Sequence, residues 1–137
     1  MSPLVRFARH LALFYSIIYK IFTTMKQFMM LFFGPYYHEL NMTPEETQQM
    51  MQKWFDWVDK LKAKDLYIAG DPLTPDAKTV RGKNPVVTDG PFAETKELVG
   101  GYFIIKANSL EQAAELAKDC PDLTLGGTVE VREIMLM

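Results

Sequence analysis

The chain has 137 residues, of which 48% are hydrophobic and 23% are charged, and its formal net charge at pH 7 is −2. This length and composition fit one globular domain, and the acidic balance argues against a nucleic-acid-binding protein. The single cysteine, Cys120, excludes an internal disulfide and a cysteine-ligated metal cluster. With one thiol in the chain, we expect a protein of the reducing cytoplasm.

The first 24 residues differ from the rest because they contain three basic residues and no acidic one. Their apolar run, residues 11–19, is too short to cross a bilayer, which needs about 20 apolar residues. We expect residues 1–24 to be an N-terminal extension translated from an upstream start, with the domain at residues 25–137. A signal-like segment and an amphipathic helix on a membrane or partner are the alternatives. Membrane contact is expected only if residues 1–24 are genuine, and a helix formed by them would pack loosely or not at all.

A buried strand is predicted over residues 28–33, where an unbroken apolar run ends at Gly34 and Pro35. Both alternating faces of this strand are apolar, so we expect both to be covered. A helix then opens at Pro44, with Thr43 as its N-cap and Glu46 completing a capping box. Its predicted buried face recurs at helical spacing: Met50, Met51, Trp54, Trp57, Val58 and Leu61.

Two main strands and a minor hairpin are predicted before the second helix. Residues 66–69 form a main strand that Gly70 stops, and residues 79–88 form the minor hairpin with its turn at residues 82–84. Residues 99–106 form the third main strand, which is again apolar on both faces.

The second helix is expected to open at Ser109, with Gln112 completing a capping box, and to be ended by Pro121. The last strand, residues 128–134, alternates polar and apolar residues, as on a strand with one face in water. The predicted apolar side of the helix comprises Leu110, Ala113, Ala114, Ala117 and Cys120.

The order of elements predicts an α+β fold, the ferredoxin-like βαββαβ plan with an antiparallel sheet. Two helices cover one face of a four-stranded sheet, yet the two central strands are apolar on both faces. We therefore predict a homodimer that forms face to face through its sheets. In the alternative, residues 1–24 fold back over the open face.

Between the hairpin and the third main strand lies Asp89-Gly90-Pro91-Phe92, whose residue types favour a turn, followed by Ala93-Glu94-Thr95-Lys96-Glu97. This stretch resembles the signature of the DGPF domain, a subgroup of the YCII-related family. The resemblance covers about residues 25–134 and implies a dimeric α+β barrel, without naming a reaction. Further similar segments follow the same order along the chain: residues 69–73, 99–103, 120–121 and 127–132.

The signature supplies candidate site residues. Asp89 is a candidate general base if burial in a cleft raises the pKa of its carboxyl group. Its alternative role is to cap the turn through backbone N–H groups. Glu94 and Lys96 are candidates for orienting a polar ligand, or they pair with each other at the surface. Arg132, on the wet face of the last strand, is a candidate clamp for a ligand carboxylate.

The resemblance also implies a His–Asp pair with the histidine on the first helix, but this chain has no histidine between Thr43 and Leu66. His38 precedes that helix and is the second catalytic candidate, with an ordinary surface position as the alternative. The chain has neither metal-binding histidine spacing nor a glycine-rich phosphate loop, so we expect no cofactor.

Two functional hypotheses remain. The first is a small homodimeric domain that binds a small polar or aromatic metabolite and transfers a proton without a cofactor. The second is a non-catalytic ligand-binding or regulatory module, because members of the resembled family occur near or fused to sigma-factor-like transcription regulators. The surroundings of Asp89 separate the two, since a catalytic base lies partly desolvated in a cavity.

Overall fold

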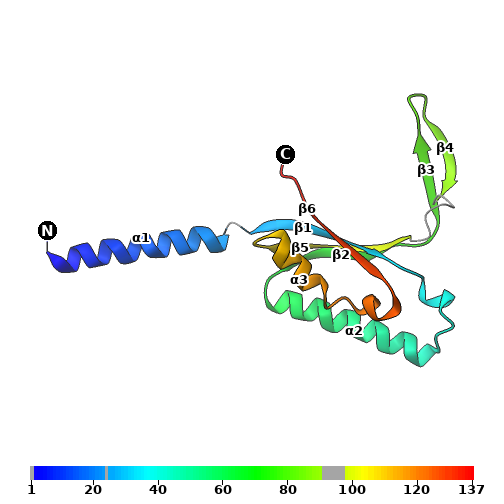
Figure 1. The fold of residues 1–137 in the computed structure, drawn as a ribbon, viewed down its shortest axis with the longest axis horizontal. Coiled ribbons are helices and arrows are strands. Elements are labelled where there is room, and N and C mark those ends of the chain that lie inside the picture. Colours follow the sequence, from blue (N-terminus) through cyan, green and yellow to red (C-terminus); the bar gives the residue numbers. More distant parts are fainter. Residues whose placement is uncertain (1, 24, 91–97) are drawn as a thin grey trace.

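In a computed structural model, which describes residues 2–23, 25–90 and 98–137, two helices pack on one face of a four-stranded sheet (Figure 1). The elements follow in this order: α1 (Pro3–Thr23), β1 (Lys26–Phe33), α2 (Pro44–Ala63), β2 (Tyr67–Pro72), β3 (Ala77–Arg81), β4 (Val86–Gly90), β5 (Val99–Ala107), α3 (Leu110–Ala117) and β6 (Thr128–Glu133). Two short 3₁₀ segments, η1 (Tyr37–Glu39) and η2 (Pro121–Leu125), follow β1 and α3.

The main sheet has the strand order β2-β5-β1-β6, and each neighbouring pair is antiparallel. Met30 of β1 is paired with Phe103 of β5 on one side and with Val131 of β6 on the other. β1 and β5 are therefore the central strands, as in the split βαβ plan. The predicted ferredoxin-like α+β fold with an antiparallel sheet is confirmed.

The core lies between this sheet and the two helices. Phe28, Met30 and Ile105 are wholly buried on the helix-facing side of the sheet. An aromatic cluster fills the space under α2, with ring centroids between 4.9 and 5.9 Å apart and mostly edge-to-face packing: Phe32, Trp54, Trp57 and Phe103. Each such pair contributes about 0.5–1.5 kcal/mol beyond the burial of apolar area.

The predicted start of α2 is confirmed in atomic detail. Thr43 Oγ1 accepts from the Glu46 backbone N–H at 3.1 Å, and the Glu46 carboxylate accepts from the Thr43 N–H at 2.8 Å. The predicted buried face is wrong at Met51, which is 41% exposed. The stripe against the sheet follows Met50, Trp54, Trp57 and Leu61, and Met51 is turned about 100° away from Met50 around the helix.

The second helix is shorter than predicted and is capped differently. Ser109 Oγ accepts from the Gln112 N–H at 3.1 Å, but the Gln112 side chain accepts from Asn108 at 2.6 Å and not from Ser109. α3 ends at Ala117, so Pro121 opens η2 instead of ending the helix. Two residues of the predicted apolar side, Leu110 and Ala114, are exposed, because α3 faces the core with Ala113, Leu116 and Ala117 instead.

Strand β2 continues beyond its predicted stop at Gly70 and ends at Pro72. Gly70 lies directly against β5, since an added Cβ would stand 2.3 Å from Phe103 Cδ1 and 2.7 Å from the Tyr102 carbonyl oxygen. The glycine therefore permits close strand pairing at this point, where the sequence pattern predicted the end of the strand.

The predicted minor hairpin is confirmed as β3 and β4, which form a separate two-stranded sheet. β4 extends to Gly90, so Asp89 lies in a strand and not in the predicted turn. Its position is fixed by cross-strand pairing with Lys78. Residues 91–97 of the signature lie outside the described residues.

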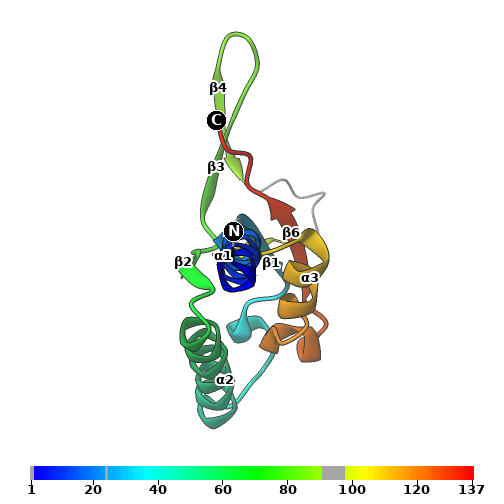
Figure 2. The ribbon, with the colours of Figure 1, turned by 90° about the vertical axis from the view of Figure 1, so that its left-hand side faces the viewer.

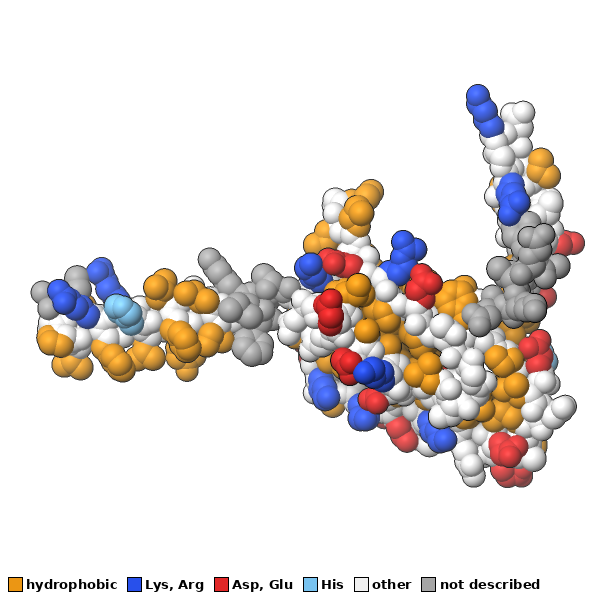
Figure 3. All heavy atoms as spheres, viewed as in Figure 1, with side chains coloured by type: hydrophobic (Ala, Val, Ile, Leu, Met, Phe, Trp, Pro, Cys, Tyr) orange, Lys and Arg blue, Asp and Glu red, His pale blue; other side chains and the backbone are white. Residues whose placement is uncertain are grey.

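Helix α1 extends away from the sheet instead of folding back over it (Figures 1 and 2). In the coloured part of α1, Figure 3 shows many hydrophobic side chains, with basic ones near the N-terminal end. Its large apolar residues, such as Leu4 and Phe7, are exposed, which fits the expectation of a loosely packed helix. Within the described ranges, we find no helix with both the length and the apolar character that a membrane span requires.

No described helix covers the other face of the main sheet (Figures 1 and 2). On this side, the central strands present side chains that alternate with the buried core residues and are half-buried by one another. We call this set the open face: Met29, Leu31 and Phe33 of β1, with Tyr102 and Ile104 of β5.

Candidate functional site

Several polar side chains meet at one end of the main sheet. The C-terminal ends of β1 and β2 meet the N-terminal ends of β5 and β6 there, because neighbouring strands are antiparallel. β5 begins at this end, and the 3₁₀ segment η1 follows the end of β1 there. Three polar clusters of described residues lie at or near this end.

The first cluster is the pair Asp71–Tyr102 beside the open face. The two residues are directly opposite each other on β2 and β5. The Tyr102 hydroxyl donates to Asp71 Oδ2 at 3.2 Å. This hydrogen bond, together with the negative charge of the carboxylate, raises the pKa of Tyr102 and keeps the phenol protonated. The pair thus offers a proton acceptor and a hydrogen-bond donor at one solvent-accessible point.

The second cluster lies under the sheet, where η1, α2 and η2 meet. The Tyr37 hydroxyl donates to Asp122 Oδ1 at 2.5 Å, and Trp54 Nε1 donates to the Tyr37 oxygen at 2.7 Å. Burial, and then the neighbouring Asp122 carboxylate, raise the pKa of Tyr37. Every member has a partner inside the cluster, so its evident role is to hold three segments together.

A glycine fixes the Asp122 end of this second cluster. The Gly127 N–H donates to the Asp122 carbonyl at 2.9 Å, and an added Cβ at Gly127 would stand 2.8 Å from that oxygen. The Gly-Gly pair before β6 therefore permits a close turn that aims Asp122 toward Tyr37.

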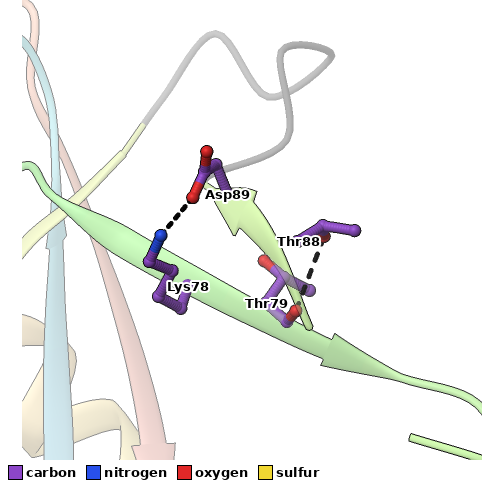
Figure 4. Close-up of polar contacts among 4 residues, drawn as sticks. All are labelled: Lys78, Thr79, Thr88 and Asp89. Atoms are coloured by element: carbon purple, nitrogen blue, oxygen red, sulfur yellow. Dashed lines mark hydrogen bonds and ion pairs between the residues drawn. The ribbon is translucent and has the colours of Figure 1, made fainter. Parts of the chain in front are cut away.

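The third cluster is on the β3–β4 hairpin (Figure 4). Lys78 Nζ makes a hydrogen-bonded ion pair with Asp89 Oδ1, and both side chains are largely exposed, at 70% and 87%. On the opposite side of the hairpin, Thr88 Oγ1 donates weakly to the Thr79 carbonyl at 3.5 Å. The Asp89 carboxylate therefore accepts a hydrogen bond from the Lys78 ammonium group. The sequence had suggested the backbone N–H groups of a turn as its donors.

The candidate residues predicted from the sequence lie on separate elements. His38 is exposed in η1, with its ring stacked on Tyr36 at a centroid separation of 5.8 Å. Arg132 is exposed on β6, in register with Met29 and so on the side of the open face. No hydrogen bond or ion pair joins His38, Asp89 and Arg132 to one another in the described part of the chain. Glu94 and Lys96 lie outside it.

The two clusters nearest the sheet were missed by sequence reasoning. Sequence reasoning assigned no site role to Asp71 or Tyr102, although both lie in segments that resemble the family, residues 69–73 and 99–103. A usable signal existed, because a tyrosine after Gly100-Gly101 and an aspartate after Gly70 both lie where a strand passes close to its neighbour. The contact of Tyr37 with Asp122 joins residues 85 positions apart and has no local signal.

Two further kinds of reactive site, a metal site and a reactive cysteine, were considered among the described residues. Among the residues that the structure describes, no three His, Cys, Asp or Glu side chains converge as metal ligands do. Cys120 is buried, and burial raises the pKa of its thiol to about 11, so the reactive thiolate is scarce near neutral pH.

Comparisons with known proteins agree with this architecture. The family model for the YCII-related domain matches residues 28–137. The chain is also 42% identical, over 52 residues, to an uncharacterized protein of Rhizobium meliloti (strain 1021). That match covers 37% of this chain and 42% of the relative, so the chain aligns with less than half of the relative's length. Since the family model matches most of the chain, including both packed helices and all of the main sheet except the first two residues of β1, the chain belongs to the YCII-related family.

Proposed function

We propose that the chain forms a homodimer through its open face and binds a small polar metabolite beside the Asp71–Tyr102 pair, where it carries out cofactor-independent proton transfer. The observation that supports this best is an apolar sheet face, not covered by a described helix, with a hydrogen-bonded acid–base pair at its margin.

The dimer follows from the composition of the open face. Leu31 and Phe33 of β1 and Ile104 of β5 are large apolar residues at the middle of a sheet, where water is an unfavourable neighbour. A second copy of the same surface offers the same shape and polarity, and a two-fold axis makes such a contact self-complementary.

The proton-transfer chemistry follows from the Asp71–Tyr102 pair. The Asp71 carboxylate can accept a proton from a substrate. The Tyr102 hydroxyl, which then no longer faces a carboxylate, can turn its hydrogen bond to the oxyanion that develops. A second copy over the open face would exclude water from this margin and strengthen both interactions. Arg132, on the same side of the sheet, remains a candidate for binding a substrate carboxylate.

The dimer is tested with one charged substitution and a matched control. Leu31→Asp places a carboxylate in the open face, whereas Phe55→Asp places one on an exposed part of α2. Light scattering after size exclusion is expected to give a dimer for the wild type and Phe55→Asp and a monomer for Leu31→Asp. A compact wild-type monomer would refute the dimer.

The ligand site is tested by thermal-shift screening of a library of small carboxylic acids and phenols. A compound that stabilises the wild type and Phe55→Asp, but not Asp71→Asn or Tyr102→Phe, would support the site. Asp89→Asn is included because Asp89 remains the second candidate base. If such a compound raises the melting temperature and is released unchanged, the family member is a binding module and not an enzyme.

A further inference from the structure

The β3–β4 hairpin, residues 77–90, stands apart from the domain as an arm. Its strands pair with each other from Ala77 opposite Gly90 to Arg81 opposite Val86 and are not part of the main sheet. Figures 1 and 2 show the arm rising from the end of the main sheet on the side opposite α2, which is the side of the open face. An isolated two-stranded hairpin is only marginally stable in water, so a surface that packs against the arm is expected.

The arm carries apolar side chains in a pattern that suits such packing. Val80 and Val87 are directly opposite each other, and each is 61% exposed. Because side chains two residues apart share one face of a strand, the Lys78–Asp89 ion pair lies on the same side as these valines. This side therefore combines a small apolar contact with a charged pair at its edge.

We infer that the arm packs its Val80–Val87 side against a second copy of the chain and so clasps the dimer. The inference rests on the proposed dimer through the open face. The arm rises on the side of the open face, so any partner that covers this face lies next to the arm. When this partner is another copy, two-fold symmetry gives each copy an arm that grips the other.

The C-terminal residues add to the same surface. The chain leaves β6 after Glu133 and rises on the side of the open face (Figures 1 and 2). Met135 and Leu136 are 81% and 86% exposed there. The open face is thus flanked by two apolar projections, the arm and this tail, as expected for a surface that receives a partner and not for one that faces water.

The arm also gives Asp89 a setting that one copy alone does not provide. In the single chain, its carboxylate is exposed and paired with Lys78. Packing of the adjacent valines against a second copy would bring this ion pair to the boundary between the copies and remove part of its water. The candidate base of the signature would then belong to a site that is complete only in the dimer.

The test uses thiol accessibility, because the natural Cys120 is buried. Val80→Cys introduces one accessible thiol on the arm, and Phe55→Cys introduces a matched one on the outer side of α2. The rate of alkylation by iodoacetamide is measured for the full chain as a dimer, after dilution to the monomer, and in the Leu31→Asp background. If the Leu31→Asp variant does not fold, dilution of the otherwise unchanged chain still provides the monomer for comparison.

The expected result is that the arm thiol of the Val80→Cys variant reacts on the order of tenfold more slowly in the dimer than in the monomer. The helix thiol of the Phe55→Cys variant is expected to react at the same rate in the dimer and in the monomer. Equal rates for the arm thiol in dimer and monomer would overturn the clasping arm and leave the dimer standing. If light scattering shows only monomer at every concentration, both the arm and the proposed dimer are wrong.

Discussion

The indole N–H of Trp54 donates to the hydroxyl oxygen of Tyr37 at 2.7 Å. This contact links α2 to the segment that leaves β1, and the Tyr37 hydroxyl extends it to Asp122 in η2. Three segments that are distant in the sequence are therefore joined through one phenol oxygen, which both accepts and donates.

Tyr37→Phe is expected to lower the free energy of unfolding by about 1–2 kcal/mol, because it leaves Asp122 with only the longer Trp54 bond. Urea denaturation followed by tryptophan fluorescence measures this loss. Tyr36→Phe is the matched control, since the Tyr36 hydroxyl makes only an exposed 3.3 Å bond to the Leu73 carbonyl. Equal stability of Tyr37→Phe and wild type would show that the cluster contributes nothing.

The raised pKa of Tyr37 predicts a loss of stability at alkaline pH. The folded state holds this proton more tightly than the unfolded state, where the pKa is about its ordinary value of 10.0. The stabilisation is therefore complete below pH 10.0 and declines as the pH rises above it. Denaturation midpoints across that range are expected to fall more steeply for the wild type than for Tyr37→Phe, and parallel curves would contradict the linkage.

Gly70→Ala is expected to destabilise the protein by about 1–3 kcal/mol, because the new methyl group would overlap the Phe103 ring. That ring cannot move away easily, since Phe32 and Trp57 pack against it. Gly100→Ala is the control, because its Cβ would meet nothing closer than 3.8 Å. Thermal denaturation compares the two, and equal melting temperatures would mean that β2 and β5 are less closely packed than described.

Deletion of residues 1–24 is expected to change the free energy of unfolding by less than about 0.5 kcal/mol, since large apolar side chains of α1 between Leu4 and Tyr19 are exposed to water. Urea denaturation of the full chain and the deletion checks this. A loss well beyond that margin would show that α1 packs on the domain in solution.

The same helix predicts a difference in lipid binding. Arg6 and Arg9, together with exposed residues such as Phe7 and Phe14, suit the surface of an anionic bilayer. Co-sedimentation with phosphatidylglycerol vesicles is expected for the full chain and not for the deletion of residues 1–24. Sedimentation of both, or of neither, would show that α1 is not a membrane contact.

Much of the fold was determined by local sequence alone. The cap at Thr43, the spacing of Trp54, Trp57 and Leu61, and the apolar runs of β1 and β5 each follow from interactions within a few residues. Their order was enough to predict the ferredoxin-like plan, because few topologies accommodate that sequence of elements. The family resemblance was readable for the same reason, since its signature is a continuous stretch.

Only the tertiary structure decided which side chains meet. Asp71 finds Tyr102 through strand pairing across 31 positions, and Tyr37 finds Asp122 across 85. The sequence marked Asp89 as a turn residue, but pairing with Lys78 placed it in a strand on an exposed arm. Capping, periodicity and turn chemistry depend on neighbours along the chain, whereas a site depends on contacts that exist only after the chain has folded.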